Sequence, residues 1–239
     1  MAIQNPAPSY PARIEGELDD DLSRGLWLIK WLLVLPHIVI LAILAILGFL
    51  LTIVAFFSIL FTKKYPRPIF DFNVGIMRWA WRVSFYAFNL GTDRYPPFTF
   101  DDVPDYPAHV DVEYPEELSR GLVLVKWWLL AIPQYIIVSL MTSGTAYAVT
   151  ELDGTVTYYE YGFSLVAFLA VVAGISLLFT KRYPRGVFDF VMGISRWSFR
   201  VWAYVILMRD EYPPFRMDLG GADPGSPAAG NDTSSTETV

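Results

Sequence analysis

The stretch WLLVLPHIVILAILAILGFLLTIVAFFSILF, residues 31–61, decides the fold class because it contains no charged side chain. Apart from the indole of Trp31, its polar side chains are His37, Thr52 and Ser58. A helix of about 20 apolar residues crosses the hydrocarbon core of a bilayer, and this run is longer. The chain as a whole is 54% hydrophobic and 18% charged, whereas soluble domains are roughly 25% charged. The sequence therefore predicts an integral membrane protein.

The chain contains two tandem copies of one unit. The motifs recur in the same order in both copies, and copy two carries about twenty additional residues, which map onto 142–161. The matched blocks are YPA at 10–12 and 106–108, LSRGL at 22–26 and 118–122, KW at 30–31 and 126–127, LFTK(K/R)YPR at 60–67 and 178–185, and YPPF at 95–98 and 212–215. We therefore predict a repeat at 10–105 and a second at 106–219, between a disordered N-terminus (1–9) and a disordered tail (220–239).

The repeated pattern LSRG…KW, FTKRYPR…FDF…RW and YPPF resembles a bacterial membrane family catalogued as a domain of unknown function and common in actinobacteria. The resemblance covers nearly all of residues 10–219. It implies a multi-pass membrane protein of the bacterial cytoplasmic membrane, and it implies no activity, ligand or catalytic residue.

The extra residues of copy two divide its apolar segment into two stretches, each about as long as a membrane is thick. We expect membrane helices at 122–141 and 162–179, with a loop in water between them. Copy one should then hold helices at 26–43 and 45–61, joined tightly near Gly48. Pro36 and Pro133 fall inside the first helix of each copy and should kink it.

A basic cluster follows the second helix of each copy. Lys and Arg beside membrane helices mark the cytoplasmic side. If both clusters are cytoplasmic, an even number of crossings separates them. We therefore predict four crossings, with both termini in the cytoplasm. The basic clusters are Lys63, Lys64 and Arg67 in copy one, and Lys181, Arg182 and Arg185 in copy two.

A third helix in each copy, at 70–90 and 188–208, carries a narrow charged stripe surrounded by aromatic residues. The helix could lie in the plane of the cytoplasmic interface with its aromatic residues in the lipid and its arginines toward headgroups. Alternatively, it could span the membrane with the stripe facing the interior of a helical bundle. The charge distribution favours the in-plane arrangement. The stripe contains Asp71, Arg78 and Arg82 in copy one, and Asp189, Arg196 and Arg200 in copy two.

Short strands complete the predicted fold, which is mainly α-helical. Val110, Val112 and Tyr114 alternate with acidic residues, and residues 14–18 form the matching segment of copy one. Residues 98–101 and 215–218 could extend the same small cytoplasmic sheet.

The charged stripes are the candidate ligand- or lipid-binding residues, because arginine binds phosphate and carboxylate groups through paired hydrogen bonds. The simpler alternative is that their Asp and Arg side chains pair with each other. His37 follows Pro36, and a hydrogen bond to the carbonyl that the proline leaves free is its expected role. Its counterpart is Gln134. His109 should be a solvated surface residue.

No motif of a known catalytic or nucleotide-binding site occurs in the sequence, and cysteine is absent. We expect no metal and no cofactor. Neither basic cluster forms the extended stripe typical of nucleic-acid binding. The sequence favours a non-enzymatic scaffold or accessory protein that engages a membrane protein or anionic lipid headgroups at the cytoplasmic face. The alternative is a small transporter or channel in which the arginine stripes line an anion or lipid path.

Overall fold

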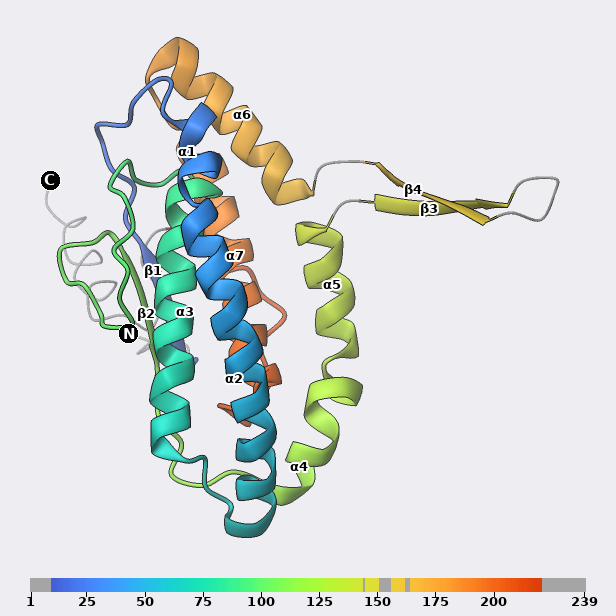
Figure 1. The fold of residues 1–239 in the computed structure, drawn as a ribbon. Coiled ribbons are helices and arrows are strands. Elements are labelled where there is room, and N and C mark those ends of the chain that lie inside the picture. Colours follow the sequence, from blue (N-terminus) through green and yellow to red (C-terminus); the bar gives the residue numbers. More distant parts are fainter. Residues whose placement is uncertain (1–9, 144, 151–155, 162–163, 221–239) are drawn as a thin grey trace, which may run out of the picture.

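In a computed structural model, the chain is mainly helical (Figure 1). The structure describes residues 10–143, 145–150, 156–161 and 164–220. The predicted disordered N-terminus, 1–9, lies outside these residues, as do 221–239 of the predicted disordered tail. Residues 144 and 151–155 of the predicted loop between the helices of copy two also lie outside.

The first copy contributes one strand and three helices: β1 (Ala12–Gly16), α1 (Trp27–Leu33), α2 (Leu35–Thr62) and α3 (Arg67–Ala87). The second copy contributes β2 (Ala108–Val112), α4 (Arg120–Val125), the π-helix η1 (Lys126–Leu130), α5 (Ile132–Thr142), β3 (Thr145–Thr150), β4 (Val156–Tyr161), α6 (Leu165–Thr180) and α7 (Arg185–Val205).

The prolines of both copies lie in the first turn of a new helix, where proline is tolerated because its missing N–H has no intrahelical partner. Pro36 follows a break at Val34 that separates α1 from α2. Pro133 begins α5, and the helix pair on its two sides is bent by 41°. The kink predicted at Pro133 is therefore present, and near Pro36 the helix is interrupted at Val34.

The predicted pair of helices at 26–43 and 45–61 is wrong, because α2 runs without a break through Gly48. A Cβ at Gly48 would lie 2.9 Å from Oδ1 of Asn73 on α3. The glycine therefore permits close packing of two helices and does not form a turn.

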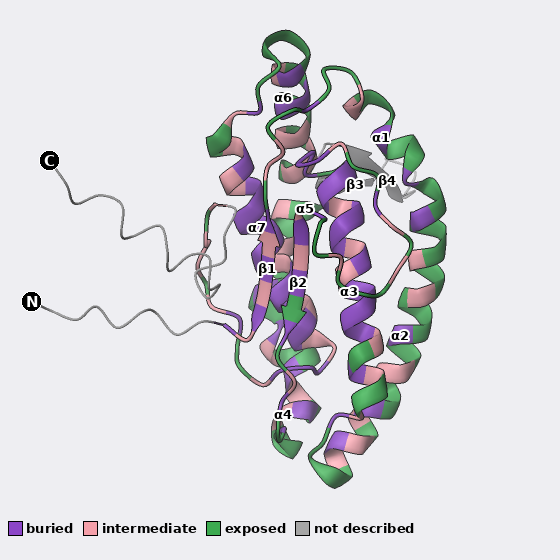
Figure 2. Ribbon diagram, turned by 90° about the vertical axis from the view of Figure 1, so that its left-hand side faces the viewer, coloured by how far each residue is buried: buried purple, intermediate pink, exposed green. Residues whose placement is uncertain are grey.

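Helices α3 and α7 form the centre of the molecule. The ring centroids of Trp81 and Phe199 lie 5.4 Å apart, and Nδ2 of Asn89 donates to Oγ of Ser195 at 3.0 Å. Most of the residues of both helices are buried (Figure 2). The prediction that the aromatic residues of these helices lie in lipid is therefore wrong, because these side chains form the core of the protein.

A two-stranded antiparallel sheet covers one side of the central helices. Strand β1 pairs with β2, with Ile14 opposite Val110, and each strand lies two residues before the segment predicted from the alternating pattern. The segments 98–101 and 215–218 are not strands. Each strand packs on the helix of the other copy, because Nε of Arg78 donates to Val110 O at 3.0 Å and Nε of Arg196 donates to Ile14 O at 2.9 Å. The two copies therefore exchange their strands.

The two copies run in opposite directions along the long dimension of the molecule (Figure 1). The end of α2 lies beside the start of copy two, where Nζ of Lys63 is 3.5 Å from Glu117. The end of α6 lies beside the start of copy one, where Nζ of Lys181 is 3.8 Å from Asp21. The two basic clusters are therefore at opposite ends of the helices, and the predicted four-crossing arrangement with both clusters at one end is wrong.

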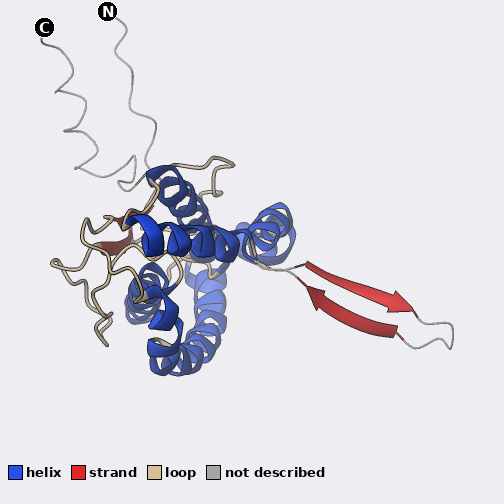
Figure 3. Cartoon of the chain, turned by 90° about the horizontal axis from the view of Figure 1, so that it is seen from above, coloured by secondary structure: helices blue, strands red, loops and turns tan. Residues whose placement is uncertain are grey.

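The remaining segment of copy two is the hairpin β3–β4, in which Thr145 pairs with Tyr161. It extends away from the helices on the side opposite to the β1–β2 sheet (Figure 3). Helices α5 and α6, on its two sides, together occupy the position that corresponds to α2 in copy one.

By length and composition, α2 could cross a membrane among the described residues. A second span is present if the bent pair Arg120–Leu130 and Ile132–Thr142 counts as one. Helix α6 is apolar but has 16 residues.

Candidate functional site

The arginines of the predicted stripes bind the protein's own backbone. Nη1 of Arg82 donates to Asp101 O at 2.7 Å, and Nη2 donates to Thr99 O. In copy two, Nη2 of Arg196 donates to Gly220 O at 2.8 Å, and Nη1 of Arg200 lies 2.5 Å from Oδ2 of Asp218. Arg82, Arg196 and Arg200 are all at most 1% exposed. These side chains fasten the loop that follows each YPPF motif to the central helices.

The two aspartates of the stripes do not pair with these arginines. Asp71 is exposed and pairs with Arg67 one turn away, at 3.0 Å. Asp189 lines an open, largely acidic cavity of about 1000 Å³, together with Asp19, Asp93 and Arg185. The structure thus brings each pair of arginines together on one helix but does not join them to Asp71 or Asp189.

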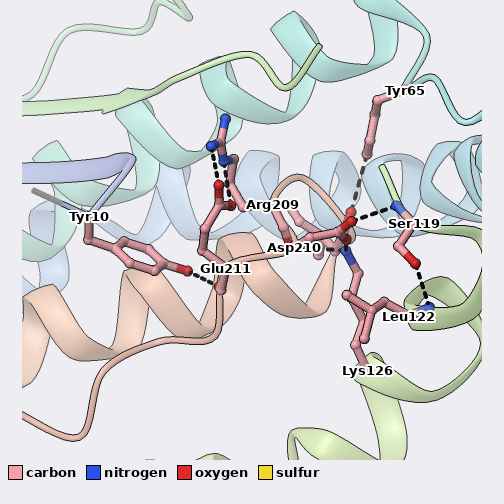
Figure 4. A network of polar contacts seen from close by, with 9 residues as sticks. Tyr10, Tyr65, Ser119, Leu122, Lys126, Arg209, Asp210 and Glu211 are labelled. Atoms are coloured by element: carbon pink, nitrogen blue, oxygen red, sulfur yellow. Dashed lines mark hydrogen bonds and ion pairs between the residues drawn. The ribbon is translucent and has the colours of Figure 1, made fainter. Parts of the chain in front are cut away.

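Two buried lysines, Lys30 and Lys126, form a site that was not predicted from the sequence. Nζ of Lys30 lies 2.7 Å from Asp93 and donates to Thr92 O at 2.6 Å. Nζ of Lys126 lies 2.7 Å from Asp210 and donates to Arg209 O at 3.0 Å (Figure 4). The signal was present in the sequence, since both copies place this lysine after LSRG and an aspartate before YPPF.

Each aspartate of these pairs also holds the chain at the start of the first helix. The backbone N–H of Ser23 donates to Asp93 at 2.5 Å, and that of Ser119 donates to Asp210 at 2.6 Å (Figure 4). Burial raises the pKa of Asp93, but the hydrogen bonds from Lys30 and Ser23 outweigh it and hold the pKa below its ordinary value. Each pair therefore connects three segments of its copy.

His37 and Gln134 occupy matched positions. The indole N–H of Trp79 donates to Nδ1 of His37 at 2.9 Å, and that of Trp197 donates to Oε1 of Gln134 at 2.6 Å. The expected hydrogen bond from His37 to the helix break is wrong. The Tyr95 hydroxyl instead donates to a neighbouring carbonyl at the break, Leu33 O, at 3.0 Å.

The expected position of His109 agrees with the structure. It lies on the outer side of the sheet, and its Nδ1 is 2.9 Å from Asp102. Both side chains are partly exposed.

The residues of both basic clusters are exposed at the two ends of the helices. In the first cluster, Lys63 is near Glu117 and Arg67 pairs with Asp71. A further exposed arginine lies at each end, Arg120 near the first cluster and Arg24 near the second. Each end thus presents four basic side chains.

The largest apolar surface lies on the side of the helices that faces away from the β1–β2 sheet. The buried residues of α2 are His37, Gly48, Ala55 and Ile59, which form one narrow line toward α3. Most of its other apolar side chains are exposed (Figure 2), including Phe49 at 66%. We call the exposed apolar side chains of α2, η1, α5 and α6 the apolar face. Its most exposed members are Val39, Ile43, Ile46, Phe49, Phe61, Ile136, Leu140, Phe168 and Phe179.

A family model described as a domain of unknown function, DUF4389, matches residues 24–99 and 155–216, together more than half of the chain. The chain belongs to the DUF4389 family. The two matched regions fall in the two copies, so the DUF4389 domain is duplicated here, in agreement with the resemblance seen in the sequence. No curated protein and no solved structure matches the chain.

Proposed function

We propose that this DUF4389 protein is a membrane-embedded, non-enzymatic scaffold or accessory protein that engages anionic lipid headgroups through its two basic clusters. The observation that supports the proposal is the apolar face, which has four exposed basic side chains at each of its ends.

Lipid is the environment that suits the apolar face. Contiguous apolar patches on soluble monomers rarely exceed a few hundred Å². Here α2 alone exposes thirteen large apolar side chains by more than 36% each, over a helix of 28 residues. Hydrocarbon chains can cover such a surface, whereas water would drive it to aggregate.

Anionic headgroups suit the ends of this face. A basic residue near an anionic membrane surface contributes about 1 kcal/mol of binding free energy. The side chains of Lys63 and Lys181 are about half exposed and have distant acidic partners, at 3.5 Å and 3.8 Å. Such exposed pairs are weak, so the ammonium groups can exchange these partners for lipid phosphate.

Vesicle flotation tests the proposal. We compare zwitterionic vesicles with vesicles that contain phosphatidylglycerol, using the whole chain with Lys63, Lys64 and Arg67 all changed to Gln. Loss of three contacts should weaken the preference for anionic vesicles by roughly tenfold to a hundredfold. The matching variant replaces Lys181, Arg182 and Arg185.

The control changes Arg13 to Gln, because this basic residue lies on the sheet and away from the clusters. This variant should keep the preference of the unchanged chain. An equal loss in the control, or no loss in the cluster variants, would refute specific headgroup binding. A purified chain that stays monomeric in water without detergent would refute membrane embedding itself.

The opposite directions of the two copies favour a second candidate function, a small transporter, since inverted repeats are common in transporters. In this version Arg82 and Arg200 would contact an anion or lipid during transport. Proteoliposomes with Arg82→Ala and Arg200→Ala test it, and an unchanged flux would exclude these residues from the path.

A further inference from the structure

We infer that the protein lies in a single leaflet of the bilayer, with its apolar face in the hydrocarbon and the β1–β2 sheet in water. The inference rests on the membrane embedding proposed above and specifies its geometry. It replaces the multi-pass arrangement expected from the sequence.

The two copies are related by an approximate twofold axis that runs from the sheet through the α3–α7 layer to the apolar face. Matched contacts carry this symmetry. Tyr10 donates to Glu211 O at 2.8 Å, and Tyr106 donates to the equivalent Arg94 O at 3.1 Å. The Lys30–Asp93 and Lys126–Asp210 pairs are likewise equivalent. A membrane environment that is compatible with one copy must therefore also be compatible with the other copy, which is rotated by half a turn around this axis.

The sheet lies beside the middle of the long helices and not at one of their ends (Figures 1 and 2). Its outer side is charged, with Arg13 3.1 Å from Asp111, whose side chain is 53% exposed. Glu15 and His109 form the neighbouring cross-strand pair on the same side. We call these four residues the sheet face.

If α2 stood upright in the membrane, the sheet face would lie at the depth of the bilayer centre. Charged side chains there are costly, and the two open edges of the sheet would have no water as a hydrogen-bond partner. With α2 parallel to the membrane plane, the sheet face is in water and the apolar face is in lipid. The described residues therefore favour the flat orientation.

The dimensions agree with this orientation. Helix α2 has 28 residues and is about 42 Å long at 1.5 Å per residue, whereas the hydrocarbon core is about 30 Å thick. One layer of helices is about 10–12 Å thick with its side chains. This is close to the depth of one leaflet, about 15 Å.

The positions of the two basic clusters also agree with the flat orientation. An upright molecule would place the second cluster on the opposite side of the membrane from the first, which conflicts with the rule that Lys and Arg gather on the cytoplasmic side. In the flat orientation both clusters reach the headgroups of the same leaflet, because the twofold axis is along the membrane normal. The hairpin β3–β4 leaves the helices on the side opposite to the β1–β2 sheet (Figure 3), so in this orientation it points into the bilayer.

Labelling of single cysteines tests the orientation, and the natural chain contains none. The exposed, matched positions Lys64→Cys and Arg182→Cys report on the two ends. Asp111→Cys reports on the sheet face and Phe49→Cys on the apolar face. Each variant is reacted with a membrane-impermeant maleimide in sealed right-side-out and inside-out vesicles. Arg67→Cys and Arg185→Cys form a second pair for the ends.

We expect the cysteines at both ends and at the position of Asp111 to react in one of the two vesicle preparations and to be protected in the other. Phe49→Cys should react only after detergent is added. Labelling of the two ends from opposite sides, or protection of Asp111→Cys in both preparations, would overturn the single-leaflet inference. Rapid labelling of Phe49→Cys in intact vesicles would instead refute the proposed membrane embedding.

Discussion

Each copy contains a buried lysine whose charge is matched by one aspartate. We predict that Lys30→Met destabilises the protein by about 3 kcal/mol, because the carboxylate of Asp93 loses its partner while it remains mostly buried. This is the low end of the range for buried pairs, since Asp93 is 21% exposed. Lys126→Met should have the same effect through Asp210. Unfolding in mild detergent measures it.

The double variant Lys30→Met/Asp93→Asn is the control for this prediction, because it removes both charges. It should recover part of the lost stability. A double variant that is as unstable as the sum of the two single variants would show that the ion pair itself contributes nothing.

The pH dependence of stability follows from the lowered pKa of Asp93. A carboxyl group whose pKa is lower in the folded state stabilises the fold above its unfolded pKa, here 3.8. This contribution is lost as the pH falls below 3.8 and through the folded pKa. We predict that Asp93→Asn flattens this part of the acid unfolding curve. Thermal melts from about pH 7 down to about pH 2, the range that includes this step, compare it with Asp71→Asn as an exposed control.

The partners of individual side chains were harder to predict than their grouping. The spacing of Arg78 and Arg82 correctly placed them on one line of a helix. Their acceptors are backbone carbonyls of Val110 and Asp101, and a carbonyl has no signature in the sequence. In contrast, the Lys30–Asp93 pair repeats in both copies and could have been found from the sequence.

At the scale of elements, helices α1, α2 and α3 were foreseeable as apolar or amphipathic segments, but the continuity of α2 was not. An uncharged run of 31 residues fits two short helices as well as one long helix. The choice depends on Gly48, which is a packing position against α3 and is equally suited to a turn.

The π-helix η1 accommodates one additional residue in copy two. Lys30 and His37 are seven residues apart, whereas their counterparts Lys126 and Gln134 are eight apart, with Trp128 as the surplus residue. Such one-turn bulges absorb insertions. We predict that deletion of Trp128 converts η1 into α-helix and changes the stability by no more than about 1 kcal/mol. Chemical denaturation in detergent measures the change.

Deletion of Leu124 is the matched control, since it also removes one exposed apolar residue from the same segment. It would turn Lys126 by about 100° relative to Ser119, and the two could no longer share Asp210. A loss of about 3 kcal/mol or more is expected. Equal effects of the two deletions would contradict the interpretation that η1 results from one inserted residue, Trp128. They would also contradict the interpretation that the two copies otherwise have the same geometry in this segment.

For the whole molecule, the duplication and the mainly helical class were evident from the repeated motifs, and the strand exchange was not. A repeat shows which residues are equivalent, but it does not show whether β1 packs on α3 or on α7. The positive-inside argument failed for a related reason. It assumed that helices cross the membrane, whereas a flat orientation also places both basic clusters on one side.

The strand exchange predicts that neither copy folds alone. In a fragment of residues 1–105, α3 would lack strand β2, and Arg78 would lose its acceptor, Val110 O. In the fragment 106–239, α7 would lack β1 and the acceptor Ile14 O. Each fragment would thus expose a face of its central helix that the intact chain buries.

We expect each fragment alone to be rapidly degraded by protease in detergent, and the co-expressed pair to co-purify and resist the protease like the intact chain. The pair with Ile14→Asp should fail to assemble, because Ile14 is fully buried between the copies, whereas Arg13→Asp on the sheet face should assemble. Protease resistance of either fragment by itself would show that a single copy is an independent domain and that the exchanged strands are dispensable.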